Sequence, residues 1–148
     1  LSQPVRAQFA TGMRQYHLQF AADPDPATAH LEATIARYTR TGDAIFLAGY
    51  QPGVFWRTER VSASRHWGTV NAEAWTDERA PVLERIVRDL RASPPGLIQW
   101  PGIDTHSARG RELANWLATH YVAPDDAPNG VWVRRSSTTI NGEALHGP

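Results

Sequence analysis

The chain has 148 residues, with fifteen acidic and fifteen basic side chains and no cysteine. Every basic residue is arginine, so Schiff-base catalysis by lysine and a P-loop lysine are excluded. The absence of cysteine excludes disulfides, thiolate catalysis and cysteine-ligated zinc. The balanced charge does not indicate a nucleic-acid partner, and no apolar run approaches the about 20 residues that span a bilayer.

The N-terminal region divides at a proline-rich break. Residues 1–22 mix hydrophobic side chains with arginine and glutamine, and we expect an N-terminal arm there. The chain begins at Leu1 without a methionine, so we expect a mature or excised part of a longer protein. Asp25 can cap a helix whose first position is Pro26. That helix is expected to run to about Arg40, with Gly42 as its left-handed stop.

The next segment predicts two parallel strands. Residues 44–49 are an uncharged apolar run bounded by turn residues, which is typical of a strand buried on both faces. A short helical turn follows at residues 52–56. Residues 61–66 are expected to form a second, shorter strand. About a dozen residues link the two strands, which is near the minimum for a parallel crossover.

The C-terminal half predicts two further helices separated by a strand. A helix begins at residues 76–78 after a loop, carries an apolar stripe to Leu90, and has a Glu84–Arg88 pair four residues apart. A third strand occupies residues 96–100. Thr105 or Ser107 is expected to cap the last helix, with His120 on its apolar face.

The turn signal Asn129-Gly130 predicts a terminal hairpin between residues 121–123 and 131–135. Alternating strands and helices predict an α/β fold, a three-layer sandwich with a mostly parallel sheet and a C-terminal antiparallel hairpin. We therefore expect one α/β domain at residues 23–135, preceded by the arm and followed by a flexible tail at residues 136–148.

Polar and aromatic residues follow each of the three predicted parallel strands. Ligands of open α/β sheets bind beyond the carboxyl ends of the strands, and aromatic faces suit sugar rings or an apolar partner. This reasoning predicts a binding site at that edge. Its candidate residues are Tyr50, Gln51, Arg65, His66, Trp67, Trp100, Asp104 and His106.

Two other interpretations remain open at this edge. The tryptophans there can simply cover the hydrophobic core. His66, Asp104 and His106 can form an acid–base pair or ligate a metal, but they have no local spacing signature of a metal site. The sequence has no recognisable catalytic centre, so we expect no catalytic residue, no metal and no cofactor in this chain.

Four segments in a fixed order carry a family resemblance. They are residues 35–52, in which a Thr-Gly-Asp turn leads into an apolar strand ending Ala-Gly-Tyr, residues 61–66, the strand after Pro94-Pro95, and residues 117–121 with 131–135. Together, residues 27–135 resemble the soluble C-terminal domain of bacterial polytopic glycosyltransferases similar to dolichyl-phosphate-mannose–protein mannosyltransferases.

The resemblance implies an extracytoplasmic domain tethered to the membrane in the full-length protein. The parent would transfer a sugar from a polyprenyl-phosphate donor, and the family's catalytic carboxylate lies in an early loop among the membrane helices. No position here matches that loop. The expected partners are the membrane-embedded portion of the same protein and a glycan or polyprenyl-phosphate sugar. The alternatives are a free-standing small α/β enzyme and a protein-interaction module that uses the tryptophan-rich edge.

Overall fold

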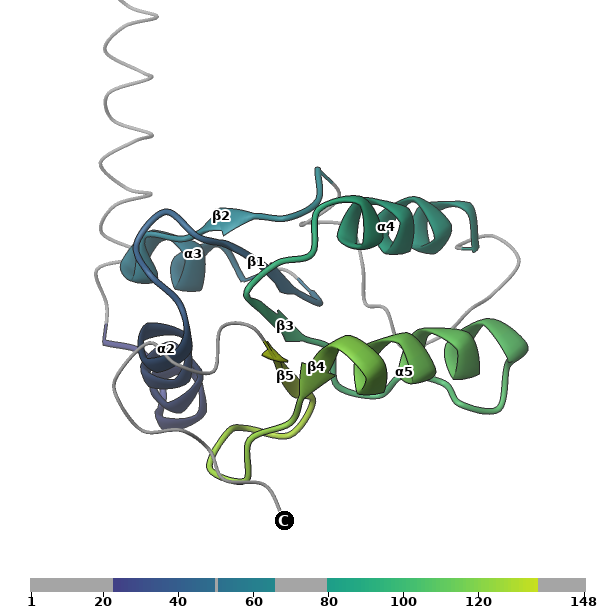
Figure 1. Cartoon of the computed structure of the whole chain (residues 1–148). Helices are drawn as coiled ribbons and strands as arrows, with labels where there is room; N and C mark the ends of the chain where they lie inside the picture. The colour runs from purple at the N-terminus through teal and green to yellow at the C-terminus, as the bar shows by residue number, and fades with distance from the viewer. Residues whose placement is uncertain (1–22, 50, 66–79, 136–148) are drawn as a thin grey trace, which may run out of the picture.

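The structure is a computed structural model that describes residues 23–49, 51–65 and 80–135 (Figure 1). The predicted arm at residues 1–22, the loop and helix start within residues 66–79, and the tail at residues 136–148 lie outside the described residues. In chain order the elements are α2 (Pro26–Tyr38), β1 (Ala44–Leu47), α3 (Pro52–Thr58), β2 (Val61–Ser62), α4 (Ala80–Ala92), β3 (Leu97–Gln99), α5 (Ala108–His120), β4 (Tyr121–Val122) and β5 (Val131–Arg134).

Helix α2 begins where the sequence predicts and ends slightly earlier. The Asp25 carboxylate accepts hydrogen bonds from the backbone N–H groups of Ala27 and Thr28, as a capping residue should. The helix ends at Tyr38 because Thr39 is extended. Gly42 has a positive φ of 83°, but it lies in the turn that follows. It shapes the approach to β1 and does not cap the helix.

Helix α5 is capped by Ser107, one of the two residues that the sequence offered. The Ser107 hydroxyl accepts a hydrogen bond from the Gly110 N–H at 2.9 Å. Gly110 is required here because the preceding loop comes very close to the helix. A Cβ at this position would lie 1.7 Å from the Asp104 carbonyl oxygen.

The described strands form one five-stranded sheet in the order β2-β1-β3-β5-β4. β1 pairs in parallel with both β2 and β3, whereas β5 pairs antiparallel with both β3 and β4. Helices combined with this sheet confirm the α/β class. The sheet is mixed, with as many antiparallel as parallel pairings, rather than mostly parallel as predicted. The connection at residues 123–130 is too short for a parallel crossover, so β5 runs antiparallel to β4. The other side of β5 pairs with β3.

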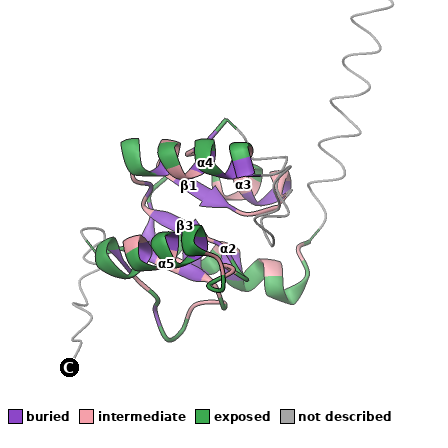
Figure 2. Ribbon diagram, turned by 90° about the vertical axis from the view of Figure 1, so that its right-hand side faces the viewer, coloured by how far each residue is buried: buried purple, intermediate pink, exposed green. Residues whose placement is uncertain are grey.

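Hydrophobic residues cluster on both faces of the sheet because successive strand residues point in opposite directions. Phe46 and Ile98 belong to a cluster that includes residues of α4 and α5. Their strand neighbours Ile45, Leu47 and Leu97 belong to a second cluster with α2 and α3. Figure 2 shows the buried residues along the strands and on the inward sides of the helices.

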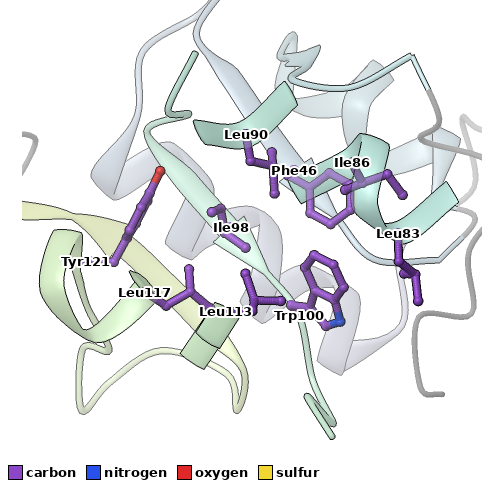
Figure 3. Packing of buried hydrophobic residues seen from close by; sticks show 9 residues of the cluster. All are labelled: Phe46, Leu83, Ile86, Leu90, Ile98, Trp100, Leu113, Leu117 and Tyr121. Atoms are coloured by element: carbon purple, nitrogen blue, oxygen red, sulfur yellow. The ribbon is translucent and has the colours of Figure 1, made fainter. Parts of the chain in front are cut away.

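The cluster under α4 and α5 contains the largest buried side chains (Figure 3). The rings of Phe46 and Trp100 lie 5.2 Å apart, and Trp100 is only 2% exposed. Each such side chain stabilises the fold by about 1.5–3 kcal/mol through burial. The Tyr121 hydroxyl donates to the Pro95 carbonyl at 3.0 Å, which attaches β4 to the segment before β3.

Candidate functional site

The segments that follow the parallel strands β1 and β3 pack on opposite faces of the sheet and lead to opposite sides of it. The segment after β1 forms α3, which packs on the α2 side of the sheet and leads to β2 at one side of β1. The segment after β3 forms α5, which packs on the other face and leads to β4 at the far edge. In open α/β sheets such a divergence marks the usual ligand position. We call Gly49, Gln51 and Gln99, which lie here, the switch edge.

Gly49 makes the turn out of β1. Its φ of 92° lies in the left-handed region, where a residue with a Cβ is strained. A Cβ added to Gly49 would meet no atom within 4 Å, so the space beside this backbone is open. The turn leads to Gln51, which precedes the first residue of α3. The left-handed turn therefore places the Gln51 side chain next to the end of β3.

Two glutamine side chains meet at the switch edge. Gln51 Nε2 donates to Gln99 Oε1 at 3.0 Å and to the Ala48 carbonyl at 3.1 Å. Gln51 Oε1 and Gln99 Nε2 make no hydrogen bond to any described residue. No buried side-chain polar atom among the described residues lacks a partner, so these two atoms are accessible to solvent. The pair thus offers an acceptor and two N–H donors close together.

Trp100 does not form part of an exposed binding surface. The sequence suggested that its ring could stack on a ligand at the end of β3. The structure corrects this, because the ring is buried against Phe46 in the cluster under α4 and α5. The backbone direction at the strand end explains the difference. Trp100 N–H still pairs with the Gly130 carbonyl at 2.7 Å, so the side chain continues the inward face of β3.

Asp104 and His106 are neighbours, but they do not form an acid–base pair. The Asp104 carboxylate accepts a hydrogen bond at 2.9 Å from the backbone N–H of His106, not from its imidazole. The His106 ring is exposed. Among the described residues, no hydrogen bond or ion pair joins either side chain to Gln51 or Arg65. This hydrogen bond shapes the turn before α5.

Of the remaining predicted site residues the structure describes Arg65, and no hydrogen bond or ion pair joins it to Gln51 or Gln99. Arg65 is exposed and follows the two-residue strand β2. Tyr50, His66 and Trp67 lie outside the described residues. In the part of the chain that the structure describes, no three histidine, aspartate or glutamate side chains come together as a metal site would require.

Sequence reasoning named Gln51 but missed Gln99. Gln99 is the last residue of β3, and its polar side chain follows the two buried apolar residues Leu97 and Ile98. That interruption of an apolar strand was the available signal. The Ser64–Asp89 contact was also missed. The Ser64 hydroxyl donates to the Asp89 carboxylate at 3.0 Å and attaches the segment after β2 to α4.

Two tyrosines with raised pKa values, Tyr38 and Tyr121, lie away from the switch edge. Burial raises the pKa of Tyr121 to about 12. Burial and a hydrogen bond to Asp126 raise the pKa of Tyr38. Neither phenol belongs to the switch edge, and both have hydrogen-bond acceptors that fix their positions. These shifts therefore reflect packing and tethering, not a general acid or base.

Comparison of the chain with protein-family models, with curated proteins and with solved structures gives no match. Within residues 23–49, 51–65 and 80–135, none of the helices has the length and apolar character needed to traverse a bilayer.

Proposed function

We propose that this chain is the non-catalytic extracytoplasmic domain of a membrane glycosyltransferase that uses a polyprenyl-phosphate sugar. In this proposal the switch edge assists in binding the acceptor or the transferred sugar. The observation that carries the binding role is the hydrogen-bonded pair Gln51–Gln99 at the divergence of the strands. The resemblance of residues 27–135 to such domains supports the choice of parent protein.

The chemistry of the paired amides suits a neutral sugar. Each sugar hydroxyl is both a donor and an acceptor, and the free acceptor of Gln51 and donors of Gln99 can bond two neighbouring hydroxyls. Amides do not titrate near neutral pH and are poor nucleophiles. The pair therefore favours recognition over catalysis, which would take place in the membrane-embedded portion of the parent protein.

The proposal includes a finer description of the fold as a three-layer sandwich with a C-terminal hairpin. The two hydrophobic clusters on opposite faces of the sheet support the layers. The antiparallel pairing of β4 with β5 supports the hairpin. In the parent protein, this domain would lie outside the cytoplasm and contact the membrane-embedded portion.

The binding role is tested by following side-chain amide signals in nuclear magnetic resonance spectra. Titration with mannose and other neutral hexoses should shift the Gln51 and Gln99 NH₂ signals and leave that of the exposed Asn115 unchanged. Glycerol at the same concentration is the control for unspecific hydroxyl contacts. Equal shifts with glycerol, or shifts at Asn115 of the same size, would remove the sugar-binding role.

One observation favours a second candidate, a protein-interaction module. Trp56 in α3 and Val61 in β2 are the large apolar side chains that are most exposed among the described residues, at 55% and 52%. A protein partner would cover them. The test is cross-linking of the parent protein, comparing Trp56→Ser with the unchanged chain. Cross-links between α3 and a partner protein that form with the unchanged chain and are absent with the variant would support the module.

A further inference from the structure

A groove of about 560 Å³ lies between α4 and α5, the two helices that cover the hydrophobic cluster containing Phe46. Its volume falls within the range of small-molecule pockets. Neither Gln51 nor Gln99 lines it. Its walls carry charged side chains from both helices over a partly apolar floor. The lining residues are Glu84, Val87, Arg88, Arg91, Ala92, Arg109, Glu112 and Leu113.

Two ion pairs cross the groove. Arg91 Nη2 lies 2.9 Å from Glu112 Oε1, and Arg109 Nη2 lies 2.8 Å from Glu84 Oε1. The four side chains are between 39% and 66% exposed. Exposed pairs of this kind contribute only about 0–1 kcal/mol, so a strongly charged ligand can compete with them. Each pair also engages one terminal nitrogen and leaves other guanidinium donors available.

Arg88 is the cation of the groove that has no carboxylate. The sequence predicted its pairing with Glu84, four residues earlier, but Glu84 pairs with Arg109 of the neighbouring helix. Among the described residues, Arg88 has no ion pair or hydrogen bond. It lies one turn from both Glu84 and Arg91 on α4, so all three share one side of the helix. Three guanidinium groups therefore face two carboxylates in the groove.

We propose that this groove binds the phosphate group of a phosphate ester, with Arg88 as the principal contact. Guanidinium groups bind phosphate through two parallel hydrogen bonds, and a dianion gains more than a carboxylate from several cations. Arg91 and Arg109 supply the donors that their ion pairs do not use. Val87, half-buried in the lining, offers apolar surface to the organic part of the ester.

The same group can come from a soluble sugar phosphate or from a lipid phosphate. Both present a terminal phosphate to the three guanidinium groups, and the groove reads this shared chemistry. The inference rests on the α4–α5 groove alone. It stands or falls independently of the neutral-sugar site at the switch edge, because the two sites share no residue.

The experiment titrates the whole 148-residue chain with inorganic phosphate at constant ionic strength and follows the arginine Nε–H signals. Arg88, Arg91 and Arg109 should respond saturably, while chloride should produce no such response. Arg88→Gln should weaken phosphate binding about tenfold, the effect of losing one charge-assisted pair. Arg85→Gln is the matched control, because Arg85 is an exposed arginine of the same helix that does not line the groove.

Two further arms identify the source of the phosphate. One uses a hexose 1-phosphate, and the other uses phosphatidylcholine vesicles with and without a phosphorylated polyprenol. Tighter binding in either arm, lost in Arg88→Gln and kept in Arg85→Gln, supports the site and names its ligand. If neither inorganic phosphate nor either ester gives a saturable response, the proposed site is wrong. An equal loss in both variants also overturns it, because binding then follows net charge.

Discussion

Gln51 and Gln99 come from segments far apart in the chain, and their side chains meet at 3.0 Å where the paths out of β1 and β3 diverge. The parallel pairing of these strands, with Leu47 opposite Gln99, brings the two side chains together. Gly49 turns the chain back so that Gln51 reaches the end of β3. The contact therefore depends on the sheet register and on one glycine turn.

Replacing Gln99 by leucine should separate binding from folding. Gln51 Nε2 keeps the Ala48 carbonyl as an acceptor, so the free energy of unfolding should fall by less than about 1.5 kcal/mol. The affinity for a neutral hexose should fall about tenfold, because its hydroxyls lose a hydrogen-bonding amide. Urea unfolding and hexose titration measure the two quantities. Asn115→Ala, at an exposed amide of α5, should change neither.

Removing the Trp100 ring should strongly destabilise the domain. Trp100→Ala leaves a cavity beside Phe46 and should reduce the free energy of unfolding by about 3–5 kcal/mol. Trp56→Ala removes the same side chain from an exposed position and should cost less than about 1 kcal/mol. Urea denaturation of both variants makes the comparison. Similar losses would mean that Trp100 is not a core residue.

Adding one methyl group at Gly110 should be costly. The new Cβ would lie 1.7 Å from the Asp104 carbonyl oxygen and 2.6 Å from its carbon, so the loop before α5 must move. We expect Gly110→Ala to lower the free energy of unfolding by about 3 kcal/mol or more, although alanine favours a helix.

Ala118→Gly tests the opposite change on the exposed side of the same helix. It should cost about 1 kcal/mol through helix propensity alone. Thermal unfolding measures both variants. A Gly110→Ala protein as stable as the unchanged chain would show that the loop does not approach α5 this closely.

The stability of the domain should fall at alkaline pH because of Tyr121. Burial raises its pKa from 10.0 to about 12, so the folded state favours the protonated phenol. This contribution is fully present below pH 10, the pKa of the unfolded chain, and is lost as pH rises through about 12. Urea midpoints recorded across this interval should decline. Tyr121→Phe should be less stable near neutral pH, by about 1 kcal/mol, and should decline less. An unchanged alkaline slope in Tyr121→Phe would assign the decline to other groups.

Local signals in the sequence predicted the starts of α2 and α5 well, whereas β1, β2 and β3 are shorter than predicted. Asp25 followed by Pro26, and Ser107 three residues before Gly110, act within one helical turn, so their roles can be read from adjacent residues. The uncharged run before Gly49 likewise identified β1. These features need no knowledge of distant contacts.

Contacts between distant segments were not predictable in the same way. Glu84 has Arg88 at a suitable helical spacing, yet Arg109 on another helix takes its carboxylate. The contact of Gln99 with Gln51 depends on the register of β3 on β1, which the sequence does not show. The sequence left open whether Trp100 contacts a ligand or covers the core, and the structure buries it on the inward face of β3. Each case depends on which elements become neighbours.

The central claim is that this domain belongs to a membrane glycosyltransferase, and the reading frame upstream of Leu1 tests it most directly. We expect a series of apolar segments of about 20 residues each, with an acidic pair in the first loop outside the cytoplasm. A frame that opens close to Leu1 with no such segments would contradict the claim.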